Sequence, residues 1–201
     1  MTDDNAVVAV NYWKESRKEL KKLLSEPWKT LLLFHNSQEV KEIADFIKKL
    51  SDSKRIVYFS LTRTYNAIIP SFEDIDKSLF IVDCISSGVF EKKNTKTSFF
   101  ENSPSNFDEI IALNEKYLNE LKPDLVILDS LSQFIDFSTP TPKYTPELYK
   151  YLNSLNNVKG PCRFILLYMD LSSKDIVFIP TYDVDLILRV EVIVEKIYWK
   201  G

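Results

Sequence analysis

Five short segments of this chain are continuously apolar, and stretches with the periodicity of amphipathic helices lie between several of them. A strand that is apolar on both faces has to be buried on both faces, which is typical of a parallel sheet covered by helices. The sequence therefore predicts an α/β fold with three layers, in which a mainly parallel, twisted sheet of five or more strands lies between helices. The five predicted strands are residues 30–34, 55–61, 78–82, 124–129 and 162–168.

The predicted helices follow from periodic apolar positions and from capping residues. The helix at 38–50 has Asn36 as a plausible N-cap and places apolar side chains at 40, 43, 44, 47 and 50 on one face. Ser105 with Asp108 resembles a capping box before a second helix, which Pro123 ends. A third helix is expected to begin at Pro146 after Thr145 and to run to about residue 156.

The remaining segments are predicted from composition. Residues 64–72 are expected to form a short helix and a loop, and a helix is expected to begin within 130–137. The polar stretch 91–106 predicts a mobile loop and is the best candidate for disorder. Residues 175–179 are a candidate short strand, and the alternating run 184–198 predicts an antiparallel strand at the edge of the sheet.

Length and composition predict one domain. The chain has 201 residues, of which 1–26 form an N-terminal extension and helix and about 27–198 form the core. The net charge of -3 does not indicate a nucleic-acid or acidic-membrane partner, and two cysteines fit buried thiols in a reducing compartment. No signal peptide and no membrane-length apolar run is visible, so we expect a soluble cytoplasmic protein.

Glycine is scarce, and this limits the chemistry of the loops. The chain has 3 glycines, whereas average usage would give about a dozen or more. Phosphate-binding loops use glycines to let backbone N–H groups approach the ligand, and a Lys-Ser/Thr pair to hold the γ-phosphate and magnesium. The first strand-to-helix turn reads His35-Asn36-Ser37-Gln38-Glu39-Val40 and has neither feature.

The segment Leu125-Val126-Ile127-Leu128-Asp129-Ser130-Leu131-Ser132 resembles the Walker B strand and following turn of the RecA superfamily, in its KaiC-like and RadA-like branch. The strands at 31–34, 57–61 and 80–84 fit the same frame. Together with Asp83-Cys84-Ile85-Ser86 and the segment 101–106, the chain resembles archaeal KaiC-like proteins with degenerate nucleotide-binding motifs. This resemblance covers roughly residues 25–195 and implies a RecA-like fold.

The resemblance also implies that the nucleotide chemistry is lost. Active members carry a Walker A loop at the position of residues 35–40 and a catalytic glutamate after the second strand, where this chain reads Ser60-Leu61-Thr62-Arg63-Thr64. Asp129 alone matches the active pattern. The candidate remnant of a nucleotide site is therefore His35, Asn36, Ser37 and Asp129, with no cofactor expected; ATP and magnesium remain the alternative.

Individual residues at the strand ends allow two interpretations each. Asp83 and Asp129 could together hold a cation, but Asp at such positions commonly caps the following turn. His35 could titrate near neutral pH or be a turn residue bonded to backbone. Ser130 has no G-x-S-x-G surroundings and is interpreted as a helix cap. Arg63 and Tyr65 could contact a partner, or Arg63 could form a surface ion pair.

The lysine-rich helix expected at 11–26 also has two interpretations. Its apolar stripe is formed by Trp13, Leu20, Leu23 and Leu24. The basic face could bind nucleic acid or a membrane surface, or it could be a solvated face while Trp13 packs on the domain or on a partner. A receiver domain is set aside, because His35-Asn36 stands where that fold needs an acidic pair.

Three functions follow. The first is a catalytically inactive RecA/KaiC-like protein with a regulatory or scaffolding role in signal transduction, acting through contacts with itself or with an active paralogue. The second is a divergent ATPase that uses Asp129. The third is a nucleic-acid-binding accessory protein that uses the basic helix and the loop Lys92-Lys93-Asn94-Thr95-Lys96.

Overall fold

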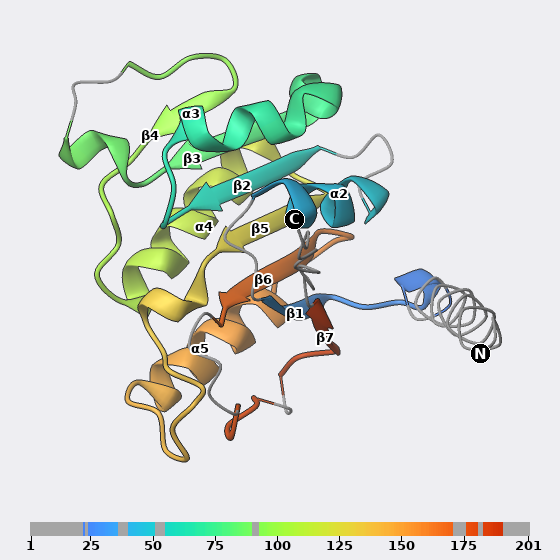
Figure 1. Cartoon of the computed structure of the whole chain (residues 1–201), viewed down its shortest axis with the longest axis vertical. Helices are drawn as coiled ribbons and strands as arrows, with labels where there is room; N and C mark the ends of the chain where they lie inside the picture. The colour runs from blue at the N-terminus through green and yellow to red at the C-terminus, as the bar shows by residue number, and fades with distance from the viewer. Residues whose placement is uncertain are drawn as a thin grey trace, which may run out of the picture.

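Seven strands form one sheet in the order β4-β3-β2-β5-β6-β1-β7, and every registered pair of strands is parallel (Figure 1). The computed structural model describes residues 22, 24–35, 40–50, 55–89, 93–170, 176–180 and 183–190. It confirms the predicted α/β fold with a parallel sheet. The strands are β1 (Thr30–His35), β2 (Ile56–Ser60), β3 (Leu79–Asp83), β4 (Ser98–Phe100), β5 (Leu125–Asp129), β6 (Arg163–Met169) and β7 (Leu186–Val190).

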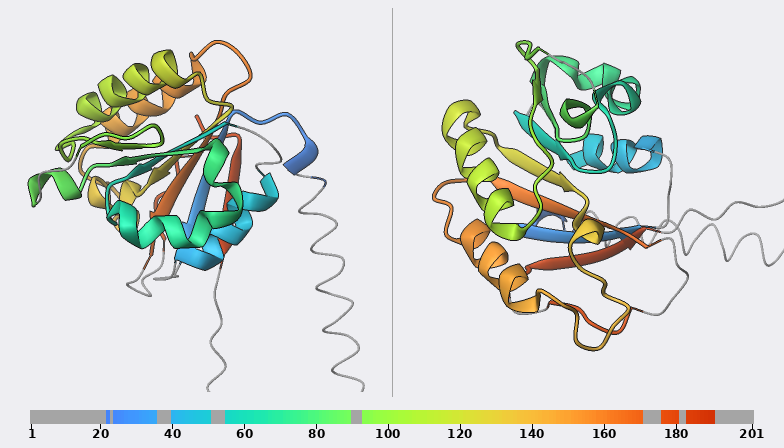
Figure 2. Two further views of the ribbon diagram at one scale, coloured as in Figure 1. Left: turned by 90° about the horizontal axis from the view of Figure 1, so that it is seen from above. Right: turned by 90° about the vertical axis from the view of Figure 1, so that its left-hand side faces the viewer.

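Helices cover both faces of the sheet (Figure 2). One face carries α4 (Phe107–Leu121) and α5 (Thr145–Asn156). The other carries α2 (Val40–Leu50) and α3 (Tyr65–Ile68), which continues as a 3-10 helix over Ile69–Ser78. Among the described residues, no helix has both the length and the apolar character needed to cross a lipid bilayer.

The core consists of two clusters, one on each face of the sheet, because side chains alternate along every strand. In β1, Leu32 and Phe34 belong to the cluster under α4 and α5, whereas Leu31 and Leu33 belong to the cluster under α2. Burial on both faces explains why these strands are apolar without interruption. Cys84 and Cys162 are buried free thiols, as expected.

The start of α4 shows why the helix begins where it does. The Asn106 side chain accepts a hydrogen bond from the Glu109 amide at 3.0 Å, and the Glu109 carboxylate accepts one from the Ser105 amide at 2.7 Å. This is a reciprocal cap, one residue later than the predicted pairing of Ser105 with Asp108. The helix ends at Lys122, whose φ of 48° is left-handed and closes the last turn.

The prediction of a mobile loop at 91–106 is wrong for the described residues 93–106, because they include β4. This strand is short and polar at its start, so the sequence pattern hides it. Its outer edge is closed locally: the Asn94 side chain accepts from the Phe100 amide at 2.8 Å, and the Thr95 amide donates to the Ser98 carbonyl at 2.8 Å. The polar residues that suggested disorder therefore protect a sheet edge.

Two further predictions at the carboxyl-terminal end are wrong. Strand β7 pairs with β1 in parallel, so the described part of 184–198 is not an antiparallel edge. Residues 176–180 are not a strand, although the amides of Val177 and Phe178 donate to the Phe137 carbonyl. The helix expected at 11–26 lies outside the described residues except at 22 and 24–26, and 191–198 also lie outside them.

Replacing the N-cap of α4 tests this account of the helix start. Asn106→Ala leaves the Glu109 amide without its side-chain acceptor, so we expect the free energy of unfolding to fall by about 1 kcal/mol. Asn106→Ser is the matched control, since a serine hydroxyl also caps well. Urea denaturation of both variants measures the difference, and equal stabilities would contradict the cap.

Candidate functional site

Polar side chains gather at the carboxyl edge of the sheet, on the face covered by α2 and α3. Ser60 is in register with Asp83 of β3 and with Asp129 of β5. Two residues earlier in these strands, Tyr58, Ile81 and Ile127 belong to the apolar cluster on that face. Because side chains two positions apart share a face, Asp83, Ser60 and Asp129 lie in a row across three neighbouring strands.

Asp129 lies at the centre of this row and is completely buried. Its Oδ2 accepts hydrogen bonds from the Tyr58 hydroxyl at 2.7 Å and from Arg63 Nη1 at 3.0 Å. The Thr62 hydroxyl lies 3.3 Å from the other oxygen, Oδ1. The carboxylate is therefore surrounded by donors from β2 and from the loop that follows it.

The contact between Arg63 and Asp129 is an ion pair in a water-poor environment. Side-chain exposure is 14% for Arg63 and zero for Asp129. A buried carboxylate is costly unless a positive charge and further hydrogen bonds compensate it. Burial raises the pKa of Tyr58 well above its usual value, and the charge of Asp129 raises it further, so the phenol stays protonated and donates. Arg63 therefore forms an ion pair, as one alternative expected, but inside the protein and not on its surface.

The loop after β2 is held so that Arg63 reaches Asp129. The Ser60 hydroxyl donates to the Arg63 carbonyl at 2.6 Å, and the Leu61 amide donates to the Asp129 carbonyl at 2.6 Å. The Gln133 side chain also donates to the Leu61 carbonyl. These contacts turn the chain back over the end of β5 and fix the position of the guanidinium.

Asp83 caps the turn after β3. Its carboxylate accepts four hydrogen bonds of 2.6–2.8 Å, from the amides of Tyr65, Ile85 and Ser86 and from the Ser86 hydroxyl. Burial alone raises the pKa of a carboxyl group, but these hydrogen bonds outweigh it and hold the pKa of Asp83 below its usual value. The capping interpretation accounts for this residue. Tyr65 contributes its amide here, and its ring packs edge-on against Phe100.

The other candidate residues lie apart from Asp129 or have structural contacts. His35 is buried at the end of β1, and its backbone carbonyl accepts a hydrogen bond from the Asp170 amide at 2.8 Å. Strand β6 lies between β1 and β5, so His35 is separated from Asp129 by one strand. Asn36, Ser37 and Trp13 lie outside the described residues. Ser130, which follows Asp129 through a cis peptide bond, caps the 3-10 turn Leu131–Gln133 by accepting from the Ser132 amide.

The described residues at this edge do not fit a magnesium–nucleotide complex. Magnesium needs carboxylate or other oxygen ligands arranged as an octahedron. Both oxygens of Asp129 already face donors, and the nearest charged group is the guanidinium of Arg63. Within the described part of the chain, no group of three or more His, Cys, Asp or Glu side chains is arranged to hold a metal ion.

Several residues of this edge could not be singled out from the sequence. Tyr58 lies within an apolar strand and reads as a core residue. Thr62 follows the strand without any motif. Asp170 and Arg189 form an ion pair of 3.6 Å between the end of β6 and β7, and only the pairing of these strands with β1 brings them together.

The fold is similar to that of a known archaeal protein. The KaiC-like protein PH0186 from the hyperthermophilic archaeon Pyrococcus horikoshii OT3 superposes with a TM-score of 0.54 and 13% sequence identity, over 86% of this chain and 76% of that chain. The chain therefore has a RecA-like fold, as the resemblance in its sequence implied. Comparisons with protein-family models and with curated protein sequences found no match.

Removing Arg63 tests the compensation of the buried charge. In Arg63→Met the Asp129 carboxylate loses its counter-ion, so we expect a loss of about 3–5 kcal/mol in the free energy of unfolding. The same substitution should cost far less in an Asp129→Asn background, because no charge is then left unpaired. The control is Arg55→Met, which removes an exposed guanidinium bonded to the Leu121 carbonyl and should cost about 1 kcal/mol or less. Additive effects in chemical denaturation would contradict the pairing.

Acid titration tests the cap at Asp83. Its lowered pKa means that its stabilisation is fully present above the ordinary value of 3.8 and is lost as pH falls through the folded-state pKa. We expect Asp83→Asn to be less stable than the natural protein at neutral pH by about 1–3 kcal/mol. The difference should shrink below pH 3.8, as urea unfolding at a series of pH values would show. A constant difference would mean that the ionised form is not the bonded one.

Proposed function

We propose that this chain is a catalytically inactive RecA/KaiC-like domain that acts as a regulatory or scaffolding protein through protein–protein contacts. The partner is a second copy of the chain or an active RecA/KaiC-like protein. One observation carries the proposal: the carboxylate that matches the Walker B aspartate is bonded by Arg63 and Tyr58 of the same chain.

The chemistry of phosphoryl transfer explains why this contact matters. Catalysis there depends on cations and backbone donors that stabilise charge on the phosphoryl oxygens. In this chain the Arg63 guanidinium forms an ion pair with Asp129, the carboxylate that would position a magnesium ion. The turn 35–40 has neither glycine nor lysine. The ion pair is a feature of the structure and the composition of the turn is a feature of the sequence, so each supports loss of catalysis independently of the other.

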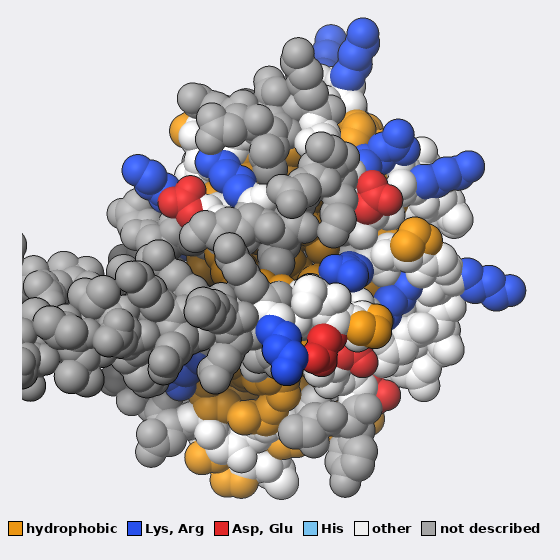
Figure 3. Space-filling model, turned by 90° about the vertical axis from the view of Figure 1, so that its right-hand side faces the viewer, with side chains coloured by type: hydrophobic (Ala, Val, Ile, Leu, Met, Phe, Trp, Pro, Cys, Tyr) orange, Lys and Arg blue, Asp and Glu red, His pale blue; other side chains and the backbone are white. Residues whose placement is uncertain are grey.

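The distribution of charge favours a protein partner over nucleic acid. Affinity for nucleic acid depends on lysine and arginine side chains that follow the phosphate backbone. On the face in Figure 3, the described basic side chains are scattered from the rim to the middle, and acidic groups lie beside several of them. The net charge is -3. A cytoplasmic location agrees with this proposal and with the buried free thiols.

Thermal unfolding with nucleotide tests the proposal. A ligand that binds the folded protein at 100 times its dissociation constant stabilises it by about 2.7 kcal/mol. We expect millimolar ATP with magnesium to leave the melting temperature unchanged, because the described edge offers no free carboxylate to the metal. Magnesium alone and ATP with a chelator are the controls for non-specific salt effects.

A hydrolysis assay distinguishes the divergent ATPase. We expect no phosphate release above that of a buffer blank. Release that is abolished in Asp129→Asn and preserved in Asp83→Asn would overturn the proposal, since it would place a working catalytic site at the carboxylate that Arg63 now pairs.

A further inference from the structure

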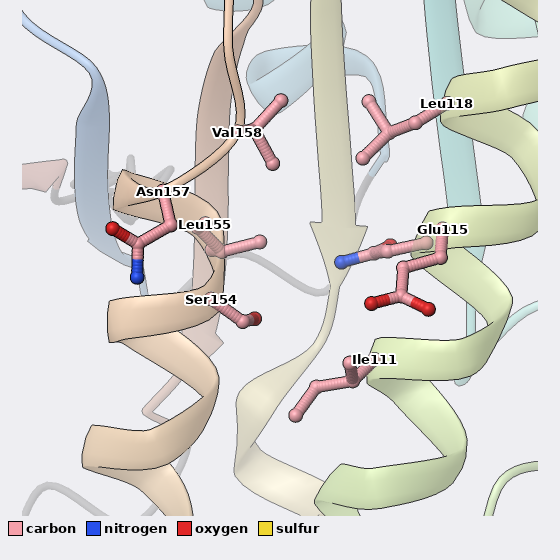
Figure 4. Close-up of a pocket in the computed structure, with 8 residues that line it drawn as sticks. Ile111, Glu115, Leu118, Ser154, Leu155, Asn157 and Val158 are labelled. Atoms are coloured by element: carbon pink, nitrogen blue, oxygen red, sulfur yellow. The ribbon is translucent and has the colours of Figure 1, made fainter.

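A cavity of about 290 Å³ lies between α4 and α5. Ile111 and Leu118 of α4 face Leu155 of α5 and Val158 just after it, as Figure 4 shows. The wall is therefore largely aliphatic. Sites for small molecules have volumes of about 300–1,000 Å³ and mostly apolar walls with a few placed polar groups, so this cavity is close to the lower end of that range. We call it the α4–α5 cavity.

One buried polar side chain of the wall has an unsatisfied acceptor. Asn114 is 3% exposed, and its Nδ2 donates to the Tyr151 hydroxyl at 3.2 Å. Its Oδ1 has no hydrogen-bond partner among the described residues. The two atoms diverge from one carbon, and Asn114 lines the cavity whereas Tyr151 does not, so Oδ1 is directed away from Tyr151 and toward the cavity. A buried acceptor without a donor is costly, and native proteins contain few of them.

The surroundings hold this amide in place and supply it with no second bond. Tyr151 is completely buried, and its ring packs against Phe107 with the ring centres 5.7 Å apart, so the hydroxyl that accepts from Nδ2 is fixed. The other donors of the wall are directed elsewhere. The Ser154 hydroxyl donates to the Tyr151 carbonyl at 2.6 Å, and Asn157 Nδ2 donates to Asn153 Oδ1 at 2.6 Å.

The charged side chains near the cavity do not select a charged ligand. Glu115 belongs to the wall, and an adjoining cavity of about 460 Å³ is lined by Lys122, Asp124 and Lys159 as well. Both signs of charge are therefore present, and all four side chains are exposed to water. What distinguishes the α4–α5 cavity is the combination of aliphatic side chains with one unsatisfied amide oxygen.

We infer that the α4–α5 cavity binds a small neutral molecule that has an apolar body and one N–H or O–H donor. The donor bonds to Asn114 Oδ1, and the body packs between the aliphatic side chains of the two helices. A water molecule at Oδ1 is the simpler alternative. One water occupies about 30 Å³ in the liquid, roughly a tenth of this cavity, and it would leave the apolar wall without contacts.

Titration of the full chain with three matched probes tests the inference. Indole has an N–H donor, benzofuran has an oxygen acceptor in its place, and indene has neither, whereas the three molecules are nearly equal in size and shape. We expect the dissociation constant of indole to be roughly tenfold lower than those of the other two, a difference of about 1.4 kcal/mol, because only indole gives Oδ1 a donor. Nuclear magnetic resonance of isotope-labelled protein measures the constants, and the shifts should centre on the amides around Asn114.

Two variants and a control locate the site. Asn114→Leu removes the acceptor and keeps a side chain of similar size, so indene should still bind and the advantage of indole should disappear. Asn119→Leu is the control, because this exposed asparagine of α4 lines only the adjoining cavity and its loss should preserve the advantage. Ile111→Trp enlarges a half-buried side chain of the wall and should abolish the binding of all three probes. Thermal melts check that each variant folds.

Three results would overturn the inference: no shifts around Asn114 at millimolar probe, equal dissociation constants for the three probes, or tighter binding of benzofuran than of indole. The first is expected if water alone satisfies Oδ1. Probe binding that survives Ile111→Trp would also contradict the location. The cavity lies under helices on the opposite face of the sheet from Asp129, so each of these results leaves the ATP tests of the proposed function unaffected.

Discussion

The burial of one negative charge determines how the carboxyl edge of this sheet is built. Asp129 ends the strand at the middle of the sheet and has no exposed surface, so its carboxylate has to be compensated within the protein. Arg63 and Tyr58 supply that compensation, and both belong to β2 or to the loop after it. Because the Leu61 amide also donates to the Asp129 carbonyl, the same contacts join the ends of β2 and β5.

In this RecA-like fold the acidic residue at the end of β5 is paired with an arginine of the same chain. A carboxylate that holds a magnesium ion has to be accessible to the ion and its water molecules. Here the positive charge is covalently part of the chain and arrives from the position where active relatives are expected to carry a glutamate. In the structure, the contacts of Asp129 with Arg63 and Tyr58 therefore stabilise this edge of the sheet.

The five central strands could be predicted because strands buried on both faces are continuously apolar. Most of the helices could be predicted because their apolar residues recur at helical spacing. The row of polar groups at the strand ends was also foreseeable, since parallel strands place their ends at one edge. The partner of Asp129 was not: Arg63 is 66 positions away in the chain, and such a contact leaves no local pattern. Strand β4 was not predicted, because the residues that close its edge, Asn94 and Thr95, are polar and typical of a loop. The direction of β7 was predicted wrongly, because an alternating pattern of apolar and polar residues is the same for a parallel and an antiparallel strand.

The most direct test of the central claim is a crystal structure grown with ATP and manganese, with anomalous diffraction used to locate the metal. We expect Arg63 Nη1 to remain in contact with Asp129 Oδ2, near the 3.0 Å of this structure, with no anomalous peak beside that carboxylate. A manganese ion bound to Asp129, with the guanidinium displaced, would contradict it.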